Sequence, residues 1–242
     1  MKKRLCELRE KILNHIRFIY PDVDADDLAN KLIAIMGLEK DCKKVKPYKN
    51  HWNQKDVIAI TYGDTFTREG EKPLHTLHQF FNTQFADIIN TIHILPFYPY
   101  SSDDGFSVIN YKQVNQTLGD WPEIETITKD FKLMADLVVN HCSSRSLWFD
   151  QFKNNKEPGK DYFIEADPDV DLSAVTRPRT NPLLNEVETV NGIKNVWCTF
   201  SFDQVDLNFR NPRVLLEIVD IINYYLERGV SIFRLDAVAF LW

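Results

Sequence analysis

Two charged residues in an otherwise apolar segment carry the clearest chemical potential in this sequence. Arg234 and Asp236 lie two residues apart in the run Val230 to Asp236, so in a strand their side chains point to the same side and can pair. A neighbouring guanidinium favours the ionised carboxylate and lowers its pKa, as a carboxylate nucleophile requires at neutral pH. The spacing therefore predicts an ion pair that keeps Asp236 anionic. A purely structural ion pair at a strand end is the alternative, and the sequence leaves both open.

A second apolar run, Met134 to Asn140, also contains polar residues. The two-residue period of a strand places Asp136, Val138 and Asn140 on one face, with His141 just past the end. A carboxylate inside an apolar strand is costly unless it has a partner, so Asp136 is expected to be paired. These residues belong either to a ligand site or to the satisfied polar groups of a core.

The segments that position these residues alternate between strand-like and helix-like patterns. The longest expected helix begins at the cap Asn211-Pro212 and stops at Arg228-Gly229. Near-continuous apolar strands that alternate with helices imply parallel pairing with the helices outside, and therefore an α/β fold. The four expected strands are Val57 to Tyr62, Thr91 to Leu95, Met134 to Asn140 and Val230 to Asp236.

The patterns divide the chain into four parts. Residues 1–50 carry two helix-like stretches and predict an N-terminal helical extension, and residues 51–153 hold the first three strand–helix units. Residues 154–200 are rich in Pro, Asp, Asn and Thr and predict an irregular inserted subdomain, after which residues 201–242 supply a helix and the fourth strand. Insertions at one end of a barrel build binding sites, so the insertion is expected beside the polar strand ends.

Composition excludes several classes of protein. The 242 residues carry a net charge of −6 with 44% apolar residues, and beyond the lysine cluster from Lys40 to Lys49 no basic stripe offers a nucleic-acid footprint. No apolar run approaches the roughly 18–20 residues that span a bilayer, and the mixed-charge start is unlike a secretory signal, so a cytoplasmic protein is expected. Neither a disulfide nor a zinc site is expected from the widely spaced cysteines, Cys6, Cys42, Cys142 and Cys198.

Three motifs resemble sequence blocks of the α-amylase family, glycoside hydrolase family thirteen. They are Asp136-Leu-Val-Val-Asn140-His141, Gln204-Val-Asp206-Leu-Asn208 and Phe233-Arg234-Leu-Asp236. Three further stretches resemble the sucrose phosphorylase branch of the family, namely His93-Ile-Leu-Pro96, Ser101-Ser-Asp103-Asp104-Gly105-Phe106 and Leu172-Ser-Ala-Val-Thr-Arg177-Pro-Arg179. The extended N-terminus is similar to that of glucosylglycerate phosphorylases. The resemblance covers roughly residues 56–242 and implies the N-terminal half of a (β/α)8 TIM barrel.

Carried over position by position, the resemblance makes Asp236 the nucleophile and Arg234 the group that keeps it ionised and oriented. Asp103 and His141 would hydrogen-bond the hydroxyls of a bound glucosyl ring, and Phe106 would offer an aromatic face. The other implied roles are a pocket position for Gln204, an anion-binding position near the acceptor for Arg179, and supporting positions for Asp136 and Asn140. A buried loop anchor at Phe106, and solvated surface charge at Arg177 and Arg179, stay open as alternatives.

The resemblance implies double displacement with retention. Asp236 would form a covalent glucosyl ester, and phosphate would then take the glucosyl group as α-glucose 1-phosphate. Such a mechanism uses two carboxyl groups about 5 Å apart, of which the second acts as acid and then base. In the family this second group is a glutamate on the strand that follows the nucleophile's strand, and the sequence ends six residues after Asp236.

A complete barrel of this kind needs about 250 residues for its eight strand–helix units, whereas this chain supplies four strands. We therefore expect a truncated half-barrel with an open strand edge that is poorly soluble and inactive on its own.

Two other functions stay open. One is a hydrolase or transglucosidase of the same family, which passes the glucosyl group to water or to a sugar. The other is a non-catalytic sugar-binding module that retains the half-site. The implied partners are a small-molecule glucoside and inorganic phosphate, with fructose, glycerate or a phosphorylated sugar as the aglycone. Nucleic acid, a membrane, a cofactor and a metal are not expected.

Overall fold

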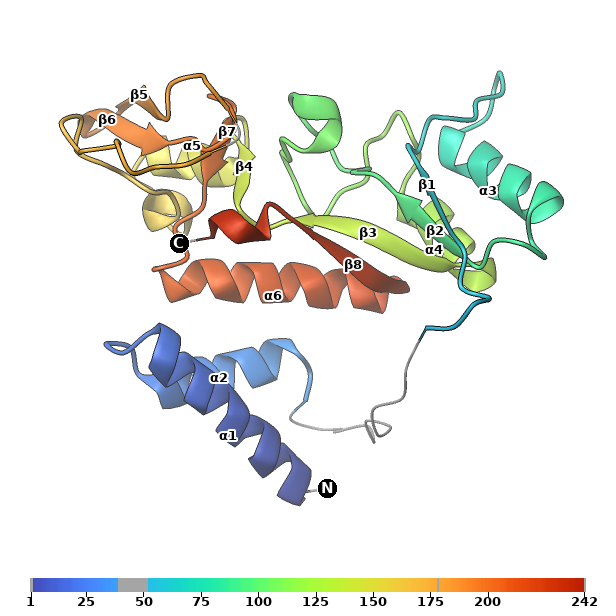
Figure 1. Ribbon diagram of the computed structural model, residues 1–242, viewed down its shortest axis with the longest axis horizontal. Coiled ribbons are helices and arrows are strands. Elements are labelled where there is room, and N and C mark those ends of the chain that lie inside the picture. Colours follow the sequence, from blue (N-terminus) through green and yellow to red (C-terminus); the bar gives the residue numbers. More distant parts are fainter. Residues whose placement is uncertain (1, 39–51, 178, 242) are drawn as a thin grey trace.

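A parallel sheet forms the centre of the molecule (Figure 1). The computed structural model describes residues 2–38, 52–177 and 179–241, so the lysine cluster, Cys42 and the expected boundary at residue 50 lie outside the described residues. The sheet order is β1-β2-β3-β8, and each neighbouring pair is parallel. The predicted α/β class is confirmed. The strands are β1 (Ile58–Thr61), β2 (Thr91–Ile94), β3 (Lys132–Val138) and β8 (Val230–Asp236).

Helices α3 (Pro73–Gln84), α4 (Trp121–Asp130) and α6 (Pro212–Glu227) pack against this sheet. The caps act as the sequence predicts. Asn211 accepts a hydrogen bond from the Arg213 amide at 3.1 Å at the start of α6. Gly229 ends this helix with φ +88, in the left-handed region. The buried stripe of α6 is Val214, Ile218, Ile221 and Tyr225.

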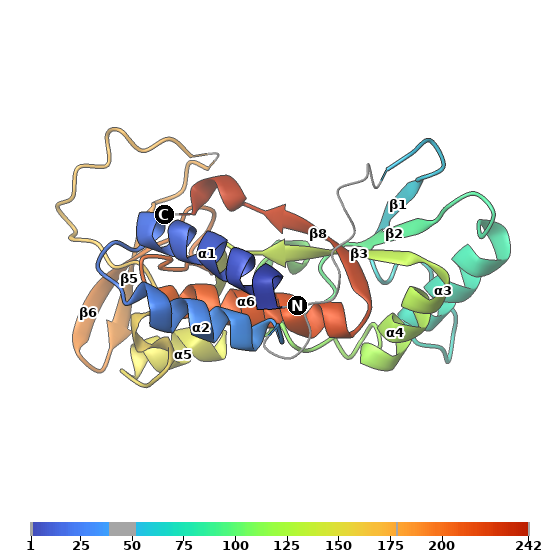
Figure 2. The same ribbon diagram turned by 90° about the horizontal axis from the view of Figure 1, so that it is seen from below.

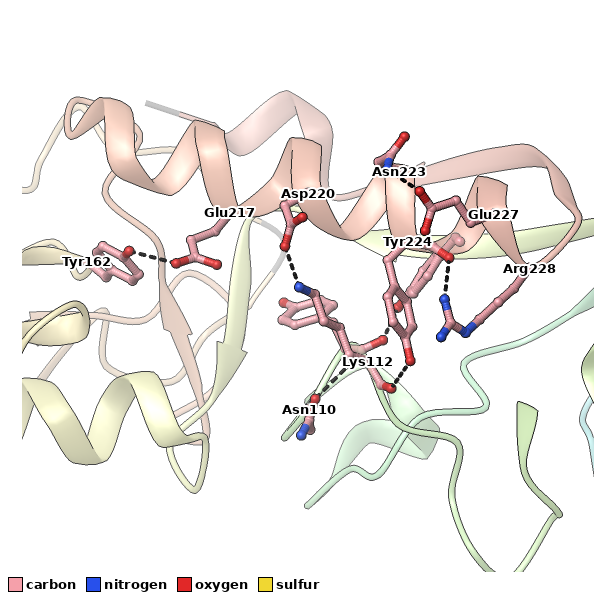
Figure 3. Close-up of polar contacts among 11 residues, drawn as sticks. Asn110, Lys112, Tyr162, Glu217, Asp220, Asn223, Tyr224, Glu227 and Arg228 are labelled. Carbon is pink, nitrogen blue, oxygen red and sulfur yellow. Dashed lines mark hydrogen bonds and ion pairs between the residues drawn. The ribbon is translucent and has the colours of Figure 1, made fainter. Parts of the chain in front are cut away.

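The polar face of α6 ties the helix to two other parts of the chain (Figure 3). Asp220 forms an ion pair with Lys112, and the Tyr224 hydroxyl donates to the Lys112 carbonyl at 3.1 Å. Glu217 accepts a hydrogen bond from the Tyr162 hydroxyl at 3.0 Å. Helix α6 thereby fixes both the long connection after β2 and the inserted segment.

The N-terminal extension is a helical hairpin of α1 (Lys2–Ile19) and α2 (Ala25–Ile35). It packs on α6, where an apolar cluster that includes Leu28 and Leu32 meets Leu215, Leu216 and Val219. The buried Tyr20 hydroxyl also donates to the Phe209 carbonyl at 2.8 Å. Helix α6 therefore lies between the sheet and the hairpin (Figure 1). Figure 2 shows the hairpin and α6 from below.

The inserted segment contains more regular structure than the sequence predicts. Strands β5 (Leu184–Thr189) and β6 (Gly192–Trp197) form an antiparallel hairpin, which follows helix α5 (Leu147–Lys153) and a short 3₁₀ turn (Gly159–Asp161). The expectation of an irregular insertion is therefore wrong for this hairpin. Val196 of this hairpin belongs to the same core as the sheet and Val187 packs against that core, and the expected domain boundaries stay predictions.

The third sheet strand, Lys132–Val138, begins and ends two residues earlier than expected. It ends at Val138, so Asn140 lies beyond the strand, and the expectation that Asn140 continues the face of Asp136 is wrong. Strand β4 (His141–Ser143) begins immediately afterwards and pairs antiparallel with β7 (Gln204–Asp206). The partner strand comes from a distant part of the chain, so local periodicity could not reveal this turn.

The outer strands of the sheet expose apolar side chains. Ile60 on β1 is 67% exposed and Leu235 on β8 is 49% exposed. In the described part of the chain, no helix combines the length and apolarity that crossing a membrane would require.

Gly229 is a point of close approach between the α6–β8 turn and α4. A Cβ added there would lie 2.5 Å from the Thr128 hydroxyl and 2.8 Å from its Cβ. Gly229→Ala should lower the free energy of unfolding by about 3 kcal/mol, of which about 1 reflects the left-handed backbone and about 2 the displaced neighbour. Urea denaturation measures this loss.

Gly70→Ala is the matched control, because Gly70 has φ +79 but no atom within 4 Å of an added Cβ. It should cost only about 1 kcal/mol. Equal losses in the two variants would contradict the role of the Thr128 contact.

Candidate active site

A chain of charged groups crosses the carboxyl ends of β3 and β8. Asp136 and Arg234 are register partners in the sheet, and Arg234 Nη1 forms an ion pair with Asp136 Oδ1. Arg234 Nη2 lies 3.1 Å from Asp236 Oδ1, which confirms the predicted pair. The Asp136 side chain is fully buried, so its partners replace the water contacts that it loses on burial.

The second oxygen of Asp136 meets a histidine that sequence reasoning missed. His93 Nε2 lies 2.7 Å from Asp136 Oδ2, and His93 is 2% exposed. His93 lies in one of the motifs that resemble the phosphorylase branch, but the sequence alone predicts no role for it. The signal that could have revealed His93 is a titratable side chain in β2, a strand whose residues are all buried.

The expected effect of Arg234 on Asp236 is outweighed. Burial raises the pKa of Asp236, Arg234 opposes the rise, and the carboxylates of Asp136 and Asp103 add to it, so the net pKa is raised. The expectation of a lowered pKa is therefore wrong. The main physical reason is the burial of the Asp236 carboxyl, which Arg234, paired with both Asp136 and Asp236, does not offset.

A second polar group comprises Asp103, Gln204 and His141. Gln204 Nε2 donates to Asp103 Oδ2 at 2.9 Å and lies 3.1 Å from His141 Nε2. His141 Nε2 is also 3.1 Å from the Phe106 carbonyl, and Asn140 Nδ2 is 3.4 Å from His141 Nδ1. Nε2 thus faces both an acceptor, the Phe106 carbonyl, and a donor, the Gln204 amide, so the tautomer of the ring decides which of these two hydrogen bonds forms. Burial lowers the pKa of His141 to about 4, so the ring is neutral near pH 7.

The loop after β2 is bent sharply to present Asp103. Asp103 and Asp104 have φ values of 56 and 49 in the left-handed region, which aspartate tolerates better than most residues. Gly105 has φ +108, and a Cβ there would lie 2.8 Å from the Pro96 carbonyl oxygen. The turn brings the half-buried Phe106 ring to 5.5 Å from the Arg234 guanidinium, so Phe106 joins the two polar groups.

Asp203, also missed by sequence reasoning, ties the loops around these groups together. Its carboxylate accepts hydrogen bonds from the hydroxyls of Ser101 at 2.5 Å, Ser102 at 2.6 Å and Ser144 at 2.6 Å. Burial raises the pKa of Asp203, but the serine hydrogen bonds outweigh it and the net pKa is lowered. Serine pairs in two loops were the only sequence signal.

Arg179 is not brought to this cluster, because its side chain is exposed on the insertion loop. Arg177 instead donates to the Thr199 carbonyl at 3.2 Å and lines a groove of about 590 Å³ together with Asp206 and Phe240. A role for Arg179 in anion binding stays a prediction. In the described residues, no group of three or more His, Cys, Asp and Glu side chains could hold a metal ion.

Parallel strands alternating with helices, with polar side chains gathered at the carboxyl ends of the strands, define a (β/α)-barrel catalytic domain of which this chain forms a part. Residues 88–241 match the family described as alpha amylase, catalytic domain. The chain belongs to the alpha-amylase family.

Similar proteins support the resemblance to the phosphorylase branch. The chain is 44% identical to the glucosylglycerate phosphorylase of Allomeiothermus silvanus over 239 residues, which cover 98% of this chain and 42% of that protein. It is 52% identical to the glucosylglycerate phosphorylase of Spirochaeta thermophila over 187 residues, 77% of this chain and 32% of that protein. The crystal structure of sucrose 6F-phosphate phosphorylase from Thermoanaerobacter thermosaccharolyticum superposes with a TM-score of 0.72 at 28% identity, covering 80% of this chain and 42% of that one. The chain thus spans less than half the length of these proteins.

The lowered pKa of Asp203 predicts a pH-dependent contribution to stability. Stabilisation by the ionised form is complete above the ordinary pKa of 3.8 and is lost as the pH falls through the lower folded value. Asp203→Asn should therefore cost about 2 kcal/mol at neutral pH, and this deficit should shrink as the pH falls below the ordinary pKa of 3.8. Thermal unfolding followed by circular dichroism at both pH values measures the difference.

Asp104→Asn is the control, because Asp104 is an exposed carboxylate in the loop after β2, whose serines Ser101 and Ser102 bind Asp203. It should change stability by less than about 0.5 kcal/mol. A deficit of Asp203→Asn that is independent of pH would contradict the charge-based explanation.

Proposed function

We propose that this chain carries the glucosyl-binding part of the active site of a retaining α-glucoside phosphorylase. The observation that carries the proposal is the Asp236 carboxylate at the end of β8, 3.1 Å from the guanidinium that orients it. The neighbouring Asp103, Gln204 and His141 supply the hydrogen-bonding groups that a sugar ring needs. Membership of the alpha-amylase family and similarity to glucosylglycerate phosphorylases support the same assignment.

In the proposed first step, an Asp236 oxygen attacks the anomeric carbon of the glucosyl unit. The bond from that carbon to the aglycone oxygen breaks, and its electron pair leaves with the aglycone, which takes up a proton. In the second step a phosphate oxygen attacks the same carbon and releases Asp236, so α-glucose 1-phosphate forms with retained configuration. Arg234 orients the attacking carboxylate of Asp236. Because the pKa of Asp236 is raised, its ionised form is a stronger base than an ordinary aspartate.

The proposed substrates are a small glucoside and inorganic phosphate. Glycerate is the favoured aglycone, because the relative that matches nearly the whole chain is a glucosylglycerate phosphorylase. Arg179 is the proposed contact for phosphate or the glycerate carboxylate, from its exposed position on the insertion loop. Asn140 and Asp136 support His141 and Arg234, and a cytoplasmic location stays a prediction.

We also propose that the 242 residues alone do not complete a catalytic cycle. The carboxylates that act on Asp236 electrostatically are Asp136 and Asp103. Asp136 is buried against Arg234 and His93, and Asp103 accepts from Gln204, so both are engaged. Neither is placed as a free acid and base for the aglycone oxygen.

A donor that needs no acid tests the nucleophile directly. With α-glucosyl fluoride the carbon–fluorine bond breaks and fluoride leaves without a proton, while Asp236 forms the glucosyl ester. The isolated chain should acquire one glucosyl group on Asp236, detected by intact-mass measurement and peptide mapping. The adduct should persist, because a base is needed to activate the acceptor.

Asp236→Asn should remain unlabelled under the same conditions, whereas Asp104→Asn should be labelled like the native chain. Label on another residue, or none, would sink the assignment of Asp236.

Inorganic phosphate should not produce catalytic amounts of α-glucose 1-phosphate from a natural glucoside with the isolated chain. Sustained phosphorolysis would contradict the proposed inactivity. Free glucose released from the adduct at the same rate with and without phosphate would favour the hydrolase alternative.

A further inference from the structure

The buried strand β2 contributes a side chain that reaches the candidate active site only through another residue. His93 is a register partner of Met134, and Asp136 lies two residues further along β3 on the same face. Asp136 is in turn the register partner of Arg234 on β8. Three neighbouring strands thus place an imidazole, a carboxylate and a guanidinium in one row across the sheet.

The contacts within this row are complementary. Asp136 Oδ1 is taken by Arg234 Nη1, and Asp136 Oδ2 lies 2.7 Å from His93 Nε2. The Asp136 side chain is fully buried and that of His93 is 3% exposed, so water cannot easily replace either partner. If one oxygen of the Asp136 carboxylate had no partner, the carboxylate could rotate about its Cβ–Cγ bond. The Arg234 guanidinium bound to it could then adopt more than one position.

The backbone of Asp136 is fixed by a separate contact. The Tyr98 hydroxyl donates to the Asp136 carbonyl at 2.8 Å. Removing the imidazole should therefore free the carboxylate rather than the strand. The other end of the row ends on Asp236, 3.1 Å from Arg234 Nη2.

We propose that His93 is a positioning residue, which locks the Asp136 carboxylate so that Arg234 holds Asp236 in one orientation. Its consequence for catalysis rests on the proposed function of Asp236, but the locking of Arg234 does not. His93 is not a catalytic residue, because Asp136 and Arg234 stand between it and Asp236.

The native 242-residue chain offers a first test that needs no variant. Long-range proton–nitrogen correlation of the His93 ring should show a proton on Nε2, the atom that faces Asp136. A neutral ring that carries its proton on Nδ1 alone would overturn the proposal, since Nε2 could then donate nothing to the carboxylate.

Nitrogen-15 spectra of the Arg234 side chain give the second test. A guanidinium clamped by two carboxylates rotates slowly and shows separate Nη signals, and these should merge in His93→Leu. His93→Gln supplies an amide donor for Asp136 and should restore the separate signals. This rescue would not occur if His93 merely filled space.

Carbon-13 titration of Asp236 reports the end of the row. The charged groups that act on this carboxyl are Arg234 on its own strand, Asp136 on β3 and Asp103 on the loop after β2. In His93→Leu the Arg234 side chain should be held less firmly, and it should then offset the effect of Asp136 and Asp103 on the Asp236 carboxyl less. The pKa of Asp236 should therefore rise by roughly 0.5.

His78→Leu is the matched control, because His78 Nε2 also lies 2.7 Å from a carboxylate, that of Asp130, outside the row. It should change neither the Arg234 signals nor the titration of Asp236. Equal effects of His78→Leu and His93→Leu, or separate Arg234 signals in folded His93→Leu, would overturn the proposal. If His93→Leu does not fold, failure of His93→Gln to keep the Arg234 signals separate would also overturn it.

The glucosyl fluoride experiment distinguishes this proposal from the proposed function. An unlabelled native chain with clamped Arg234 signals would refute the nucleophile and leave the positioning role intact. If the native chain is labelled but the separate Arg234 signals persist in His93→Leu, the positioning role alone would be refuted.

Discussion

Burying the Asp136 carboxylate between three strands is possible because a guanidinium meets one of its oxygens and an imidazole the other. These partners come from β8 and β2, which are far apart in the sequence and flank β3 in the sheet. The parallel register that aligns Asp136 with Arg234 is therefore a condition for the charge cluster as well as for the sheet. Arg234 carries this constraint outward to Asp236, at the carboxyl end of β8.

A second buried carboxylate organises the loops in a different way. Asp203 is satisfied by serine hydroxyls from the loops that follow β2 and β4, rather than by a cation. The contrast explains the opposite pKa shifts of two aspartates in one region. Several short hydrogen bonds outweigh burial and lower the pKa of Asp203, whereas burial outweighs the Arg234 guanidinium and raises the pKa of Asp236.

Much of the fold could be predicted because its signals are local. Apolar runs marked the four strands, and the Asn211 cap and Gly229 marked the ends of α6. The end of β3 was misplaced, since the pairing of β4 with β7 that turns the chain there is a tertiary contact. The site was predicted in part: the short motifs identified residues that lie together, but Arg179 remains on an exposed loop.

By itself the sequence determined the class of fold, the family and the pairing of Arg234 with Asp236, because each depends on periodicity or on neighbouring residues. Tertiary structure alone decided how deeply Asp236 is buried and which carboxylates surround it, and so the direction in which its pKa moves. The tertiary structure also brings His93 and Asp203 into contact with partners that are distant in the chain. Electrostatic energies depend on distance and burial in space, and a linear sequence records neither.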